Sequence, residues 1–129
     1  MTGYFDGASR GNPGHAGAGA CILDGGEVLW ECSEYLGVKT NNEAEYAALI
    51  FLLREAKARG LREIEIRGDS KLVVCQVRRE WKINAPHLRE PASEAWGLLE
   101  DTNATLEWIP RSENVMADAL SNKAIDDRA

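Results

Sequence analysis

The sequence predicts an α/β protein with a five-stranded mixed sheet, three antiparallel strands followed by two parallel strands, flanked by helices. Three observations lead to this prediction. Extended patterns fill residues 2–38, and helical and extended patterns alternate after them. The 129 residues, 44% of them hydrophobic, are enough for one domain covering residues 1–129.

The first strands are marked by a two-residue alternation and by turn residues. Residues 2–9 alternate in this way, and the turn cluster at residues 10–14 ends the strand. Residues 16–24 and 27–38 are extended again, and the Gly-Gly pair between them tolerates the positive φ of a hairpin turn. Three consecutive antiparallel strands are therefore expected.

The remaining elements begin at a helix start signal. Thr40 and Glu43 have the spacing of a capping box, which predicts a helix that runs to about Arg59 and ends at Gly60. After it we expect a strand at 62–67, a helix at 70–77, a break at 81–86, a helix at 87–101, a strand at 104–109 and a helix at 112–127. Helical crossovers make the last two strands parallel to the first, which becomes central.

Charge and cysteine content exclude several classes of protein. The chain has 21 acidic and 15 basic residues and a formal charge of −6, so any contact with nucleic acid must be local or assisted by metal ions. Cys21, Cys32 and Cys75 lack C-x-x-C spacing, which argues against a zinc knuckle or a disulfide framework. The sequence shows no apolar run of membrane-spanning length and no signal-peptide pattern, so we expect a cytoplasmic protein that does not contact membranes.

Four acidic residues fall where the patterns place a core or a ligand-binding edge. Asp6 lies on the central strand, and Glu45 lies on the inward stripe of the first helix. Asp69 follows the carboxyl end of the fourth strand, and Asp118 lies on the last helix, four residues after Asn114. If these acids converge at one sheet edge, cations must neutralise them, and oxygen-only ligands favour Mg²⁺ or Mn²⁺.

Such a site predicts hydrolysis of a nucleic-acid backbone. Two ions about 4 Å apart activate a water and stabilise the leaving oxygen of a phosphodiester. Each acid also has a simpler explanation: Asp6 as a turn residue, Asp69 as a helix cap, and Asp118 as a residue typical of early helical turns. Asp6 and Glu45 fit these explanations poorly because their faces are otherwise apolar. We assign Glu43 to the capping box.

Four segments, in order, resemble type 1 ribonuclease H. They are FDGASRGNPG at 5–14, TNNEAE at 40–45, GDS at 68–70 and NVMAD at 114–118. The resemblance spans nearly the whole chain and implies the family's five-stranded fold. It also implies endonucleolytic cleavage of the RNA strand of RNA–DNA hybrids, with 5′-phosphate and 3′-hydroxyl products. By motif position it places the catalytic, metal-binding acids on Asp6, Glu45, Asp69 and Asp118, with Mg²⁺ or Mn²⁺ as cofactor and two ions when substrate is bound.

The resemblance also implies contacts with the hybrid. Asn12, Asn41 and Asn42 become candidates for the RNA minor groove, and Thr40 becomes a candidate for a DNA phosphate. Short amides are suited to the 2′-hydroxyl, which distinguishes RNA from DNA. Helix capping is the alternative for Thr40, Asn41 and Asn42, and the two roles are compatible.

The chain departs from many bacterial members in two places, as short archaeal-like members do. The stretch 108–113 has no histidine, and Arg111 is the candidate catalytic-site residue in its place, with a plain surface arginine as the alternative. The basic protrusion rich in Lys and Trp is missing. Its nearest equivalent is a short cationic stretch: Arg78, Arg79, Trp81 and Lys82. Trp81 either stacks beside the DNA strand or belongs to the core, and we expect His15 and His87 at the surface.

Two other functions are weighed against the nuclease. The first is a catalytically silent nucleic-acid-binding module, which the loss of one acid would indicate, but all four acids are present. The second is a related nuclease of the same architecture that acts on double-stranded RNA or on DNA junctions. The T-N-N segment, which contacts hybrids in the resembling family, argues against DNA junctions, while the shortened loop leaves double-stranded RNA open as a substrate. We expect the protein to be a monomer.

Overall fold

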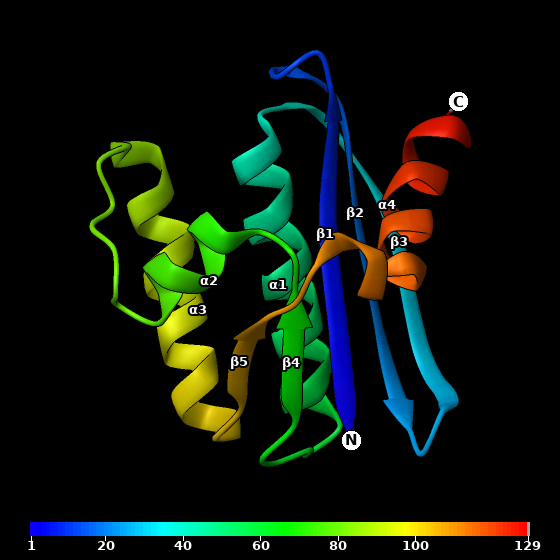
Figure 1. The fold of residues 1–129 in the computed structure, drawn as a ribbon, viewed down its shortest axis with the longest axis vertical. Coiled ribbons are helices and arrows are strands. Elements are labelled where there is room, and N and C mark those ends of the chain that lie inside the picture. Colours follow the sequence, from blue (N-terminus) through cyan, green and yellow to red (C-terminus); the bar gives the residue numbers. More distant parts are fainter. Residues whose placement is uncertain (129) are drawn as a thin grey trace.

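The computed structural model describes residues 1–128 and contains the predicted mixed sheet (Figure 1). Its strands are β1 (Thr2–Arg10), β2 (Gly14–Asp24), β3 (Glu27–Lys39), β4 (Glu65–Gly68) and β5 (Thr105–Trp108). The strand order is β3-β2-β1-β4-β5, with the first three strands antiparallel and with β4 and β5 parallel to β1. The prediction that the first strand is central is confirmed.

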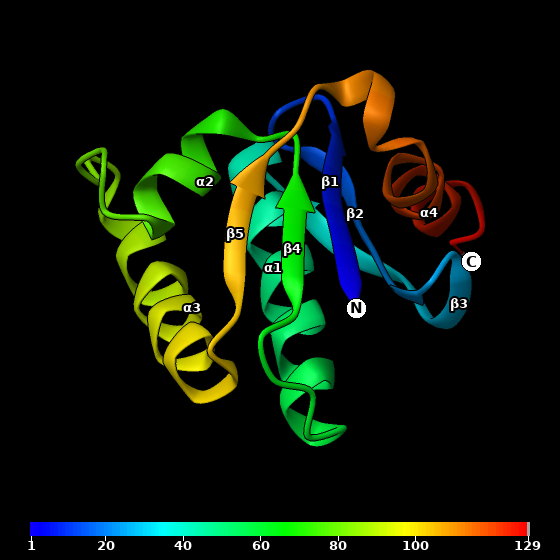
Figure 2. The same cartoon turned by 60° about the horizontal axis from the view of Figure 1, so that its bottom comes forward.

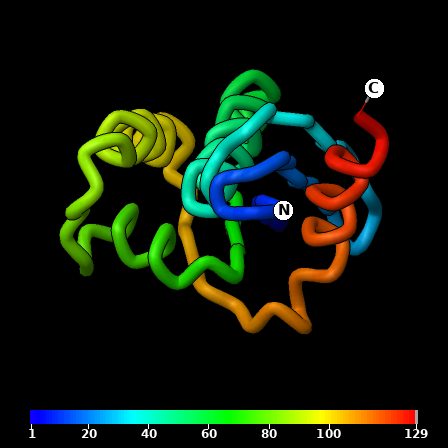
Figure 3. The backbone as a smooth tube through the Cα atoms, turned by 90° about the horizontal axis from the view of Figure 1, so that it is seen from above, coloured from blue at the N-terminus to red at the C-terminus, as the bar shows by residue number. Residues whose placement is uncertain are grey.

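Helices cover both faces of the sheet. They are α1 (Asn41–Ala58), α2 (Lys71–Val77), α3 (Arg89–Thr102) and α4 (Val115–Asp126), with the 3₁₀ turns η1 (Pro86–Leu88) and η2 (Arg111–Glu113). Viewed along the strands, α1 and α4 lie on different sides of β1 (Figure 3). Helix α3 packs beside α1, and α2 lies near β5 and α3 (Figure 2). None of the helices within residues 1–128 combines the length and apolar character needed to cross a membrane.

The hydrophobic core lies between the sheet and α1. Phe5 and Ile66 from the strands are fully buried, as are Leu49, Leu52 and Leu53 of α1. On the other face, α4 packs directly on the backbone of β2. The three cysteines are free, as the spacing predicts.

Several predicted boundaries differ from the structure for local reasons. The strand expected at 62–67 begins only at Glu65, because Glu63 has a left-handed backbone with φ of 60° and cannot extend the strand. The helix expected at 87–101 begins with η1, and Pro91 is tolerated in the first turn of α3, where no helical partner is required for its nitrogen. The helix expected at 112–127 begins only at Val115, after η2.

Candidate active site

The candidate site lies at a step in the sheet, where β4 ends and β1 continues. Gly68, the last residue of β4, pairs with Phe5, whereas β1 extends to Arg10 alongside β2. Asp6 directly follows Phe5, and Asp69 directly follows Gly68. Parallel pairing therefore brings these two acids together at the carboxyl edge, where open α/β sheets place ligands.

Glu45 reaches the same step from α1 because Gly7 has no side chain. A Cβ at Gly7 would lie 2.3 Å from the carbonyl carbon of Ala44 and from the nitrogen of Glu45. The first turns of α1 therefore rest on the β1 backbone, and they carry the Glu45 carboxyl to Asp6.

The start of α1 is fixed by the predicted capping box. The Glu43 N–H donates to Thr40 Oγ1 over 3.2 Å, and the Thr40 N–H donates to Glu43 Oε1 over 2.9 Å. Glu43 has the capping role expected from the sequence. Its carboxylate is engaged at the helix end, and the hydrogen bond from the Thr40 backbone lowers its pKa.

Asp118 reaches the site from the opposite face of the sheet. Gly19 is the sheet partner of Asp6, and a Cβ at Gly19 would lie 2.3 Å from the carbonyl oxygen of Ala117. This close approach of α4 brings Asp118, the next residue, to the level of Asp6. Two helices thus deliver acids to one strand, each across a glycine.

Three of the four acids form a tight cluster. One carboxylate oxygen from each of Asp6, Glu45 and Asp69 lies within 4.8 Å of the others. Asp6 is 5% exposed and Glu45 is 3% exposed. Asp6 Oδ1 accepts a hydrogen bond from the Gly7 N–H over 3.0 Å, but Glu45 Oε2 is buried with no partner. An unpartnered buried carboxylate oxygen beside two further acids marks a place for a cation.

The protonation of Asp6 and Glu45 reflects this crowding. Burial raises the pKa of Asp6 to about 7 from an ordinary 3.8, and the charges of Asp69 and Asp118 act in the same direction. Burial, together with the proximity of Asp6, raises the pKa of Glu45 well above its ordinary value. The oxygen-only donor set fits a hard divalent cation, which would stabilise the ionised carboxylates.

Asp118 lies beside the cluster and is held by other groups. Its Oδ1 is 3.4 Å from Arg111 Nη2 and 3.4 Å from Asn122 Nδ2. Arg111, on η2, is 80% exposed, so the shortened loop presents a guanidinium at the rim of the site. All three side chains line a cavity of about 310 Å³ together with the clustered acids and Arg10.

Sequence reasoning missed Asn122, whose amide donates to Asp118, and Arg10, which holds Asn122. The Arg10 guanidinium donates to Asn122 Oδ1 over 3.3 Å and pairs with Asp126 over 2.6 Å. Asn122 lies one helical turn after Asp118, and this i, i+4 spacing was the one available signal. Asn114 was recognised only as part of a motif, although it is buried and contacts Asp69.

Three of the predicted hybrid contacts gather next to the cavity. Asn12 Oδ1 accepts a hydrogen bond from the Asn41 N–H over 2.9 Å, which ties the β1–β2 turn to the start of α1. Thr40 is the N-cap residue of α1, and Asn41 lines the acidic cavity. Asn42 faces a separate cavity of about 520 Å³, whose lining includes Trp81 and Lys82.

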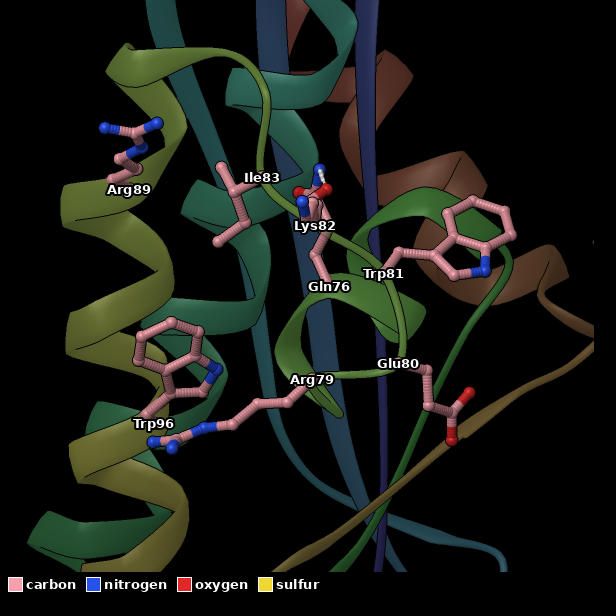
Figure 4. A pocket seen from close by; sticks show the side chains of 8 residues that line it. All are labelled: Gln76, Arg79, Glu80, Trp81, Lys82, Ile83, Arg89 and Trp96. Carbon is pink, nitrogen blue, oxygen red and sulfur yellow. Dashed lines mark hydrogen bonds between the residues drawn. The ribbon is translucent and has the colours of Figure 1, made fainter.

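Trp81 lies on the loop between α2 and α3 and is 47% exposed, so of the two alternatives left open for it, a place in the core is wrong. The reason is local: the Glu80 and Trp81 N–H groups both donate to the Cys75 carbonyl, which ends α2 and turns the chain outward. Figure 4 shows Trp81 directed away from Trp96, whose indole N–H donates to the Val77 carbonyl. Trp81 does not line the acidic cavity.

The two histidines are exposed, as expected. His15 Nδ1 is 2.6 Å from the Tyr35 hydroxyl. His87 precedes α3, and neither histidine lines the acidic cavity.

The strand order, with a group of acids at the place where β4 ends and β1 continues, defines this chain as a ribonuclease H-like α/β protein. A family model described as reverse transcriptase-like matches residues 4–124. Ribonuclease HI of Halobacterium salinarum is 45% identical over 126 residues, which are 96% of this chain and 63% of that protein. This chain thus spans less than two thirds of that relative's length. Ribonuclease H of Polynucleobacter asymbioticus is 33% identical over 96% of this chain and 88% of that protein.

Solved structures agree with these relatives. Ribonuclease H1 of Halobacterium salinarum has a TM-score of 0.94 at 44% identity and is covered over 98% of both chains. LC11 ribonuclease H1, solved in complex with an RNA/DNA hybrid, has a TM-score of 0.91 at 40% identity, covering 97% of this chain and 96% of that one. This chain belongs to the type 1 ribonuclease H family.

Proposed function

We propose that this chain is a metal-dependent endonuclease that hydrolyses the RNA strand of RNA–DNA hybrids. The observation that carries this proposal is the convergence of Asp6, Glu45 and Asp69 within 4.8 Å, with a buried oxygen of Glu45 left without a partner. The choice of substrate is supported by the similar LC11 enzyme, which was solved with an RNA/DNA hybrid.

In this proposal Asp6, Glu45, Asp69 and Asp118 hold Mg²⁺ or Mn²⁺, two ions when the hybrid is bound. When bound, such ions lower the pKa of water and neutralise charge that develops on the leaving oxygen. The water oxygen bonds to phosphorus while the bond from phosphorus to O3′ breaks, and one proton of the water ends on O3′. The products are a 5′-phosphate and a 3′-hydroxyl.

The remaining site residues bind and orient the substrate. Arg111 stands at the rim beside Asp118 with its guanidinium in solvent, where it contacts a phosphate or the departing product. Asn12, Asn41 and Asn42 bind the RNA minor groove, and Thr40 binds a DNA phosphate. Trp81 is exposed and stacks beside the DNA strand. Because these contacts are few and the chain is acidic, binding should be weak, and because it depends on phosphate contacts it should weaken further as salt is added.

The decisive experiment compares hybrid, double-stranded RNA and duplex DNA of one sequence, each 5′-labelled, with Mg²⁺ or Mn²⁺. We expect cleavage of the RNA strand of the hybrid, while Asp6→Asn lowers the rate by roughly 100-fold or more. A hybrid that stays intact with both metals contradicts the proposal. Retention of the intact hybrid on the protein would then identify a silent binding module. Additional cleavage of double-stranded RNA would broaden the substrate range.

A further inference from the structure

Asn114 is the N-cap residue of α4, but its side chain does not cap the helix. An Asn at the N-cap commonly accepts a hydrogen bond from a backbone N–H of the first turn. The Asn114 side chain makes no such bond. It is 1% exposed, and its Oδ1 is buried without a hydrogen-bond partner. A buried polar group left unsatisfied in this way calls for an explanation elsewhere in its contacts.

The explanation lies in the other end of the same amide. Asn114 Nδ2 donates to the Phe5 carbonyl over 2.9 Å and lies 3.3 Å from Asp69 Oδ2. Phe5 immediately precedes Asp6, and the Asn114 carbonyl accepts from the Asp118 N–H over 3.1 Å. One residue therefore connects the strand that carries Asp6, the carboxylate of Asp69 and the helix that carries Asp118.

The backbone of Asp69 is held separately from its carboxylate. The Trp108 indole N–H donates to the Asp69 carbonyl over 3.2 Å. The next residue, Ser70, caps α2 by accepting from the Val73 N–H over 3.2 Å. Removing the Asn114 amide would therefore free the Phe5 carbonyl and the Asp69 carboxylate but leave the backbone at Asp69 in place.

A freed Asp69 carboxylate would not stay where it is. Asp6 and Glu45 lie within 4.8 Å, so like-charge repulsion drives Asp69 towards solvent, and the Asn114 donor opposes this rotation. The donor lies 3.3 Å from Oδ2, and the cluster requires only one carboxylate oxygen of Asp69. Mutating a group that hydrogen-bonds to a metal ligand and so orients it commonly lowers metal affinity by about 10- to 100-fold.

We infer that Asn114 is a positioning residue that fixes the Asp69 carboxylate against Asp6 and Asp118 and thereby sets the affinity of the site for a divalent cation. The inference rests on the proposed function, because it takes the acidic cluster to be the metal site. It adds an amide, not itself a metal ligand, to the groups on which cation affinity depends.

The test measures metal binding without substrate. Mn²⁺ is titrated calorimetrically into wild-type protein, Asn114→Ala and the control Thr102→Val, at a temperature where circular dichroism shows all three folded. Thr102 is 1% exposed, and its hydroxyl donates to the Leu98 carbonyl inside α3, so the control also loses a buried hydrogen bond. We expect Asn114→Ala to bind Mn²⁺ about 10- to 100-fold more weakly and Thr102→Val to bind like wild type.

If Asn114→Ala and wild type bind Mn²⁺ with equal affinity, the inference is overturned. The proposed function is decided separately, by whether the wild type cleaves the hybrid. A loss shared equally by Thr102→Val also overturns the inference, because destabilisation alone would then weaken binding. If Asn114→Ala does not fold, Asn114→Ser takes its place, since its shorter hydroxyl can cap α4 but is one atom short of the Asn amide. In cleavage assays, kcat should fall at limiting Mn²⁺ while the KM for hybrid stays unchanged.

Discussion

Asp6 and Glu45 occupy positions that their elements otherwise fill with apolar side chains. On the same elements Phe5, Leu49 and Leu52 are fully buried in the core. The sequence identified both acids because a charge on an apolar face is visible as a break in a periodic pattern. Asn122 was not identified and Asn114 was noted only for its place in a motif, because an amide acts through directed hydrogen bonds that depend on how several elements meet.

Replacement of Asp6 by asparagine tests the repulsion within the cluster. Asn keeps the acceptor for the Gly7 N–H and removes one charge beside Glu45. We expect metal-free Asp6→Asn to melt about 3–8 °C higher than wild type at pH 8, and Mg²⁺, which should stabilise the wild type, to stabilise the variant much less. Thermal melts with and without Mg²⁺ make the comparison. A large fall in melting temperature would show that Asp6 has a structural role instead.

At the level of elements, two helices approach the strand pair β1–β2 more closely than side chains normally permit. Gly7 admits α1 on one face, and Gly19 admits α4 on the other, each with a virtual Cβ 2.3 Å from helix backbone. These approaches set the depth to which Glu45 and Asp118 reach. The site is thus built as much by the absence of two side chains as by the presence of four acids.

Gly7→Ala should therefore displace the first turns of α1 and carry Glu45 away from Asp6. We expect a loss of about 2–3 kcal/mol in the free energy of unfolding, of the size seen for overpacking, and a fall in hybrid cleavage. Urea denaturation and cleavage assays measure the two effects. Gly97→Ala is the control, because nothing lies within 4 Å of a Cβ there and alanine favours the helix. Similar behaviour of the two variants would contradict the close-packing argument.

The order and type of the main elements could be predicted because they depend on local periodicity, caps and turns. Element ends were less predictable where a single backbone conformation decides them, as with the left-handed Glu63 before β4. Trp81 was ambiguous because an aromatic next to charged residues suits a surface or a core. The backbone bonds to the Cys75 carbonyl, which place it outside, are not encoded in any pattern of side chains.

At the scale of the whole molecule, the chain carries a formal charge of −6, and four of its acids meet two arginines at one cavity. Glu43 and Asp126 have lowered pKa values, through the Thr40 backbone and the Arg10 guanidinium respectively. Their contributions to stability are present above their unfolded pKa values and are lost only in acid.

Between pH 5 and 8 Asp6 and Glu45 should dominate the pH dependence of stability. Their effect has the opposite sign, because both pKa values are raised in the folded state. The folded pKa of Asp6 is about 7 against an unfolded 3.8, so the folded state holds a proton that the unfolded state has released, and stability falls as pH rises towards about 7. At about 1.4 kcal/mol per pKa unit, and with part of the effect shared with Glu45, metal-free protein should lose about 3 kcal/mol across this range. Urea denaturation at several pH values measures this loss.

Saturating Mg²⁺ should abolish this loss of stability, because the cation binds the ionised carboxylates, and Asp6→Asn should reduce it. Stability that rises with pH in the metal-free protein would mean that the carboxylates are already neutralised by other groups.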